Sequence, residues 1–150
     1  MPAICTIVES LPAGRRARVL LEVPGADDVL DLAAPEGVEV TWLPRSRGAG
    51  GSAPRGSLLT AAVVEAAAEL ADLLAPSPVA ALEDVDVDSG ILWEVPAEAG
   101  VSPGSSGVYA WLAGEAGVVT GLRRHLVQEL GVDRRSVAFM GYWREGRESD

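Results

Sequence analysis

A strand that turns directly into a helix is the feature that most constrains how this chain can fold. The run "VYAWLA", residues 108–113, is continuously apolar, and Gly114 and Glu115 end it. A helix-like pattern follows at once, with Gly131 as its stop signal. A continuous apolar strand that leads into a helix is typical of a buried parallel sheet, because helices connect parallel strands and cover the faces of the sheet. The apolar face of this predicted helix comprises Val118, Val119, Leu122, Leu126, Val127 and Leu130.

The rest of the chain alternates between helix-like and strand-like patterns. The runs "ARVLLEV" and "VEVTWL" are rich in β-branched and aliphatic residues, as strands are. Residues 57–75 predict a helix with Ser57 as its N-cap, and its acids form one stripe, so we expect it to be buried over most of its circumference. In chain order the pattern predicts a helix at 2–11, strands at 17–23 and 38–43, a helix at 57–75, one or two short strands within 81–96, a strand at 108–113, the helix that stops at Gly131 and a strand at 134–143.

This order of elements predicts an α/β protein with a mainly parallel sheet and helices on both faces. In such a sheet, ligands bind beyond the carboxyl ends of the strands. Three stretches would lie there: Pro44–Arg47, Ala113–Glu115 and Gly141–Arg144. These strand ends are therefore the places in which we look for function.

Composition excludes several classes of function. The chain has 150 residues, which is one domain by length, and a net charge of −10, which disfavours nucleic acid or an anionic membrane as the main partner. It has no lysine, so a Schiff-base mechanism is excluded, and one cysteine and one histidine, so it has neither an internal disulfide nor a Cys/His zinc site. No apolar run is long enough to span a bilayer and no signal segment opens the chain, so we expect a cytoplasmic protein.

Residues 44–56 form a small basic island in this acidic chain, with Arg45, Arg47 and Arg55 and no acid. Arg45 and Arg47 lie directly after a predicted strand. Arginine side chains bind phosphate oxygens through two parallel hydrogen bonds, and an arginine in this region of a dinucleotide-binding fold commonly holds the adenosine 2′-phosphate. The same residues also fit a solvated basic loop. Both interpretations stay open.

The turn from Ala113 through Gly114 to Glu115 combines small residues with one carboxylate. Small residues let a ligand or another backbone approach a strand end closely, and the helix dipole favours an acid at a helix N-terminus. The turn therefore fits a ligand site, and it fits equally well a tight turn with a capping acid.

Tyr142, Trp143 and Arg144 end the last predicted strand. Two aromatic side chains at such a place can stack on a flavin or nicotinamide ring, and they can also form an aromatic cluster at the edge of the sheet.

Other motifs give weaker indications of function. The run "DVDVDSG", Asp84–Gly90, begins like a calcium loop but has Ser89 where the glycine is required, so a strand with one solvated face explains it better. The run "GSSG" at 104–107 is not a nucleophile elbow, and His125 has no evident partner, so a hydrolytic triad has no support. Cys5 is interpreted as a packing residue, and we predict no metal site.

The C-terminal third of the chain resembles the siderophore-interacting protein family, flavin-dependent ferric-siderophore reductases related to ferredoxin–NADP reductases. The family pattern W-x-A-G-E reads here as Trp111–Glu115, and the pattern G-Y-W-R-x-G-R reads as Gly141–Arg147. Shorter matches at "PAI", "ARVLLEV", "VEVTWLPR" and "GSLL" extend the resemblance over essentially all 150 residues.

The resemblance implies that residues 1–150 are the NAD(P)H-binding domain of such a reductase, with a Rossmann-like three-layer parallel sheet. NADPH or NADH would be the cofactor, Arg45 would contact its adenosine phosphate, and Arg45 and Arg47 together would decide between the two. Ala113, Gly114 and Glu115 would lie near the nicotinamide. Tyr142, Trp143 and Arg144 would lie near the junction of flavin and nicotinamide. No residue of this chain is predicted to be catalytic.

The chain departs from the family pattern at its N-terminal side. Nothing in it matches the R-x-Y-[ST] motif of the family's FAD-binding barrel, and Met1 stands where the turn after the first strand of the nucleotide domain would end. We therefore expect the first strand to be missing, which leaves a gap between strands 17–23 and 108–113 or makes them pair directly. FAD would then come from a partner domain or chain, and a ferric siderophore would be the substrate. The NAD(P)H-binding half formed by this chain would be inactive alone. The alternative is a non-catalytic module that pairs, for example as a homodimer, through its exposed sheet edge.

Overall fold

A computed structural model describes residues 2–46, 50–70, 93–94 and 108–146 of the chain. They belong to two compact units, Met1–Ala66 and Ala67–Asp150, and each is considered by itself. Arg47 and the Asp84–Gly90 run lie outside the described residues.

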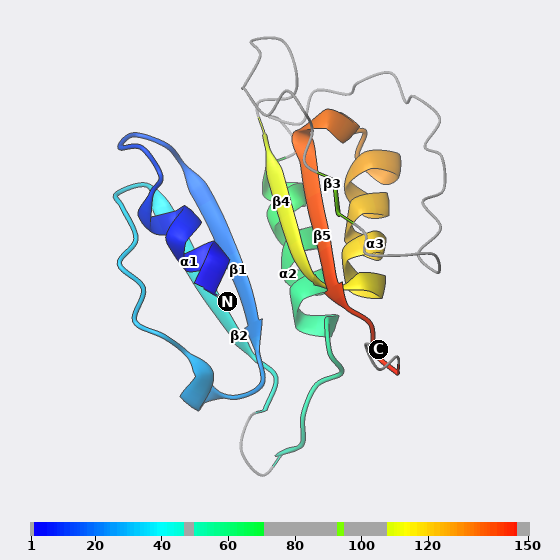
Figure 1. The fold of residues 1–150 in the computed structure, drawn as a ribbon. Helices are drawn as coiled ribbons and strands as arrows, with labels where there is room; N and C mark the ends of the chain where they lie inside the picture. Colours follow the sequence, from blue (N-terminus) through cyan, green and yellow to red (C-terminus); the bar gives the residue numbers. More distant parts are fainter. Residues whose placement is uncertain (1, 47–49, 71–92, 95–107, 147–150) are drawn as a thin grey trace. The chain divides into compact units, whose positions relative to one another are not determined.

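The first unit is built on two parallel strands, β1 (Ala17–Val23) and β2 (Val38–Pro44), which pair in register from Ala17 opposite Val38 to Val23 opposite Pro44. Helix α1 (Pro2–Glu9) precedes them, and a short 3-10 turn, η1 (Ala26–Asp28), lies in the connection between them (Figure 1). Both strands match the sequence prediction, β2 being one residue longer. The core comprises the buried residues Val8, Val19 and Leu21, with Ile4, Leu32, Val38, Val40 and Trp42 packed against them.

Helix α2 (Ser57–Glu69) begins where the sequence predicts a helix. The expectation that it is buried over most of its circumference is wrong: Ala67 is its buried residue, and Val64 is 42% exposed. A narrow acidic stripe does not establish burial of the remaining face, because apolar atoms contribute more than half of a folded protein's surface. The predicted continuation to residue 75 lies outside the described residues.

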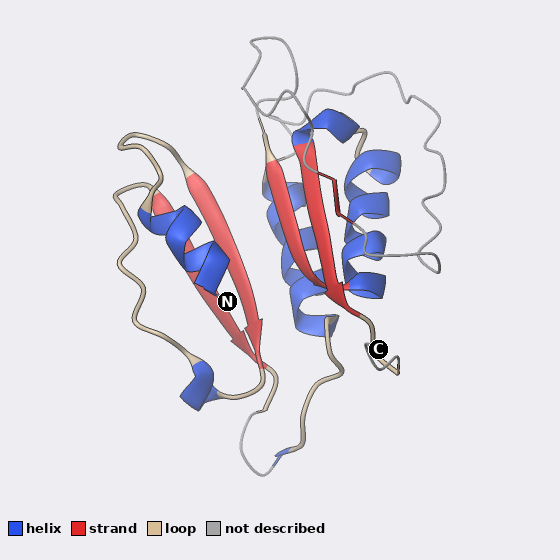
Figure 2. Ribbon diagram, in the orientation of Figure 1, coloured by secondary structure: helices blue, strands red, loops and turns tan. Residues whose placement is uncertain are grey.

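The second unit is a three-stranded sheet with the order β3-β5-β4 (Figure 2). Strands β4 (Ala110–Glu115) and β5 (Val137–Trp143) are parallel, and the short strand β3 (Trp93–Glu94) runs antiparallel to β5. The chain between β4 and β5 forms helix α3 (Ala116–Arg124), a π-helical segment η4 (His125–Glu129) and a 3-10 turn η5 (Arg134–Ser136).

The core of the second unit confirms the predicted apolar helix face. Val119 packs with Phe139 of β5 and Leu112 of β4, and the other buried positions of the face follow at helical spacing. These further buried residues are Leu122, Leu126 and Val127. The helix ends at Gly131, whose φ of 70° is a conformation that suits glycine. The π-helical segment before it was not predicted.

The described chain is thus a mixed α/β structure with two parallel strand pairs. The expectation of a mainly parallel sheet holds for both pairs, whereas β3 is antiparallel. Within the described part of each unit, β1 pairs with β2, and β4 with β5. A direct pairing of strands 17–23 and 108–113 would join the two units and stays an expectation. None of the described helices has the length and apolar character that crossing a membrane requires.

Candidate functional site

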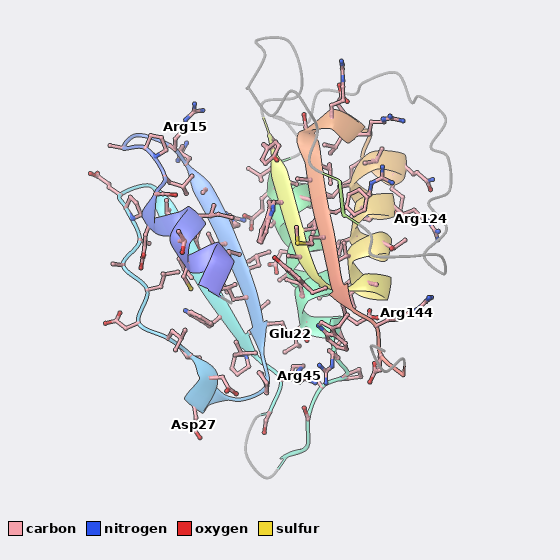
Figure 3. All side chains as sticks on the ribbon, in the orientation of Figure 1. Arg15, Glu22, Asp27, Arg45, Arg124 and Arg144 are labelled. Atoms are coloured by element: carbon pink, nitrogen blue, oxygen red, sulfur yellow. The ribbon has the colours of Figure 1, made fainter. Side chains whose placement is uncertain are left out.

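Arg45 follows the end of β2, where the backbone holds it on both sides. Its N–H donates to the carbonyl of Val23 at 2.9 Å, and its carbonyl accepts from the N–H of Ala53 at 3.0 Å. Its Nε lies 3.6 Å from Oε1 of Glu22, near the end of β1, and Figure 3 shows both side chains at these strand ends. The Arg45 side chain is 16% exposed and that of Glu22 is 8% exposed, so this ion pair is largely buried.

The Glu22 carboxylate also binds the N-terminus of α2. Its Oε1 accepts from the N–H of Gly56 at 2.7 Å and its Oε2 accepts from the N–H of Leu59 at 3.0 Å. The first N–H groups of a helix have no partner within the helix, so Glu22 satisfies two donors that would otherwise be free. Ser57, predicted as the N-cap, is instead the first helical residue, and its hydroxyl donates to the carbonyl of Pro54.

Glu115 connects three parts of the second unit. It ends β4 and is the N-cap of α3, where its Oε2 accepts from the N–H of Val118 at 2.9 Å. Its Oε1 accepts from the N–H of Glu145, beyond the end of β5, at 3.3 Å. Partial burial raises the pKa of Glu115, but hydrogen bonds from backbone N–H groups and the nearby charge of Arg144 outweigh it, so the pKa lies below its ordinary value of 4.5.

Two glycines at the turn have separate reasons to be glycine. Gly114 has a φ of +155°, which L side chains rarely adopt, and among the described residues none but its chain neighbours would have an atom within 4 Å of a Cβ there. A Cβ on Gly117 would come within 3.0 Å of Oε2 of Glu115. Gly114 therefore leaves the end of β4 open, and Gly117 makes room for the capping carboxylate.

The ends of β4 and β5 lie side by side. Gly114 is opposite Gly141, and Glu115 is opposite Trp143, with an irregular register between these two pairs. The Tyr142 and Trp143 side chains are 57% and 39% exposed, so both aromatic rings remain accessible.

The structure therefore brings together two of the three predicted stretches, Ala113–Glu115 and Tyr142–Arg144. Arg45 belongs to the first unit, so a cleft that it shares with the other two stays a prediction. Arg47 lies outside the described residues. Within the described part of the chain, no group of three potential ligand residues is placed to hold a metal ion.

Sequence reasoning missed Glu22. It is the single acid in "ARVLLEV", close to the carboxyl end of an otherwise mostly apolar strand. A charge at that place in a sheet is costly to bury without a partner, and this signal could have identified it.

Comparison with known proteins identifies the chain. The family model described as "siderophore-interacting protein" matches residues 1–146. The chain belongs to the siderophore-interacting protein family. A relative from Mycobacterium tuberculosis strain H37Rv, an uncharacterised protein, is 32% identical over 152 residues, which cover 100% of this chain and 43% of the relative.

Two solved structures of this kind are also similar. A siderophore utilisation protein from T. fusca is 27% identical, with a TM-score of 0.58, over 98% of this chain and 42% of that protein. A siderophore-interacting protein from Aeromonas hydrophila is 28% identical, with a TM-score of 0.53, over 96% of this chain and 46% of that protein. The chain thus spans less than half the length of these proteins.

Proposed function

We propose that this chain is the NAD(P)H-binding half of a flavin-dependent ferric-siderophore reductase that releases iron inside the cell. The main observation in support of the proposal is that two strand ends lie side by side. The end of β4, at Gly114 and Glu115, has a glycine without a side chain, and the end of β5, at Tyr142 and Trp143, has two aromatic side chains. A ligand ring can approach the backbone closely at the glycine, and it can stack on the aromatic side chains. We further propose that the two units form one Rossmann-like three-layer domain in the cytoplasm.

The chemistry of the described residues fits a nicotinamide nucleotide. Apart from its two chain neighbours, no described residue has an atom within 4 Å of where a Cβ on Gly114 would lie, and a planar ring close to the strand end needs such room. Arg45 carries a guanidinium at the end of β2, and in a Rossmann-like domain an arginine in this region would contact the adenosine side of the dinucleotide. When bound, the reduced nicotinamide supplies a hydride.

The aromatic strand end fits a flavin supplied by a partner domain or chain. Tyr142 and Trp143 are both accessible, and the Arg144 cation follows them. An aromatic face suits stacking on the flat isoalloxazine ring, and a cation suits the phosphate groups of FAD. Because this chain lacks the family's flavin motif, we expect little or no reduction of a ferric siderophore when it is mixed alone with NADPH and FAD.

Isothermal titration calorimetry with NADPH and NADH tests the proposal. We expect saturable binding to the wild-type chain and weaker NADPH binding by Arg45→Ala, by up to about threefold, because a charge-assisted contact to phosphate is lost. Arg18→Ala is the matched control, since Arg18 also pairs with a glutamate on the neighbouring strand, at 3.6 Å from Glu39, but lies at the opposite end of β1. Equal NADPH affinity in all three proteins would contradict the role of Arg45.

A second candidate is an assembly module without catalytic function. Among the described residues, β1 is hydrogen-bonded along one edge, to β2. An open strand edge can pair with another chain. Size-exclusion chromatography with light scattering separates the candidates: a dimer that binds no nucleotide supports the module, and a monomer that binds nucleotide excludes it.

A further inference from the structure

Glu22 is a largely buried carboxylate at this strand end. A site that only binds phosphate would not be expected to contain a buried negative charge. A strand end of this kind offers two features that hold phosphate: a guanidinium and the N–H groups at a helix N-terminus. Here Glu22 engages both. Its Oε1 lies 3.6 Å from Nε of Arg45, and its two oxygens accept from the N–H groups of Gly56 and Leu59.

The effect of this arrangement on an extra phosphate is electrostatic. A carboxylate beside a guanidinium cancels much of its charge, and it repels a second anion most strongly where both are shielded from solvent. With Glu22 8% exposed and Arg45 16% exposed, solvent screens the pair only in part. A helix N-terminus that already binds a carboxylate stabilises a bound phosphate less.

We propose that Glu22 is a specificity-determining residue that weakens the binding of an adenosine 2′-phosphate by Arg45, so that the site accepts NADH about as well as NADPH. The inference rests on the proposed function and deepens it, because it concerns which of the two nucleotides this half binds.

A purely orienting role for Glu22 predicts the opposite result. If the carboxylate served to aim Arg45 at the phosphate, its removal would weaken phosphate binding. The backbone already fixes the base of this side chain, through the bonds from Arg45 N–H to Val23 and from Ala53 N–H to Arg45. We therefore expect charge cancellation by Glu22 to outweigh any orientation of Arg45. The two roles predict opposite changes in phosphate affinity when the Glu22 carboxylate is removed.

The test compares 2′,5′-ADP with 5′-AMP, two probes that differ by the 2′-phosphate, by calorimetric titration of the full chain. In the wild type we expect the 2′-phosphate to improve affinity by less than about threefold. In Glu22→Gln we expect the ratio of 2′,5′-ADP affinity to 5′-AMP affinity to be about three- to tenfold larger than in the wild type. Glu39→Gln is the matched control: Glu39 also lies 3.6 Å from an arginine, but its side chain is 68% exposed, and the substitution removes the same charge. It should leave the ratio of affinities unchanged.

In an Arg45→Ala background, Glu22→Gln should produce no gain, because the effect acts through the guanidinium. Circular dichroism checks that each variant is folded, and the wild-type ratio tests the inference even if Glu22→Gln fails to fold. A ratio that stays constant or falls in Glu22→Gln, or a large preference for 2′,5′-ADP in the wild type, would overturn the inference while nucleotide binding persists. Binding of neither probe to any variant would instead contradict the proposed function itself, and the inference with it.

Discussion

Glu115 at the end of β4 lies opposite Trp143 of β5, although the preceding pair of Gly114 and Gly141 would place it opposite Tyr142. The register between the two pairs shifts by one residue, so Tyr142 is an extra residue on its strand. Bulges of this kind redirect side chains and occur often near functional sites. In this unit the shift allows two successive aromatic residues to end the strand with both side chains accessible.

Replacing the Glu115 carboxylate should loosen the junction of β4, α3 and the segment after β5. We expect Glu115→Gln to lower the free energy of unfolding by about 1 kcal/mol, because an N-cap acceptor and its favourable interaction with the helix dipole are weakened. Urea denaturation measures the change. Glu145→Gln is the control, since the contact to residue 145 uses its backbone N–H and not its carboxylate. Equal stability of both variants and the wild type would contradict the role of Glu115 as a cap.

The same carboxylate should make stability depend on pH. The pKa of Glu115 is lowered in the folded chain, so its ionised form stabilises the fold. This contribution is complete above the ordinary pKa of 4.5 and is lost as the pH falls below that value through the lowered pKa of the folded state. The difference in unfolding free energy between wild type and Glu115→Gln should therefore be constant at neutral pH and shrink in acid. A difference that grows in acid has the wrong sign and would contradict this assignment.

The sequence predicted local patterns well and contacts between distant residues poorly. The bounds of β1 and the buried face of α3 follow from the spacing of apolar residues, which acts over a few positions. The contacts from Glu22 to Gly56 and Leu59 span 34 and 37 residues, and no local pattern encodes them.

At the candidate site, too, local patterns were predictable and contacts between distant residues were not. Residues 113–115 and 142–144 could be predicted to lie together because the carboxyl ends of parallel strands meet at one edge of a sheet. The shift of register at Trp143 could not be predicted, because it depends on how two strands pair and not on the composition of either. The hydrogen bond from the Glu145 backbone to Glu115 follows from that pairing.

Two glycines of the second unit should respond to the same substitution with opposite signs. Gly114→Ala should lower the free energy of unfolding by about 1 kcal/mol or more, because its φ of +155° is strained for alanine. Gly121→Ala should raise it by as much as about 1 kcal/mol, because Gly121 lies inside α3, where a Cβ would meet no atom of the described residues within 4 Å apart from its own helix. Thermal and urea denaturation of both variants provide the comparison. A stabilising Gly114→Ala would show that the backbone there is not constrained as described.

We propose that Arg45 and the ends of β4 and β5 bind one nicotinamide nucleotide. The most direct test is a titration of the isotope-labelled chain with NADH, followed by NMR through the backbone amides of Arg45, Gly114, Glu115 and Trp143. We expect these signals to shift together and to saturate with a single dissociation constant. Signals at Gly114 and Trp143 that stay unchanged while NADH saturates the chain elsewhere, or an absence of any shift, would contradict it.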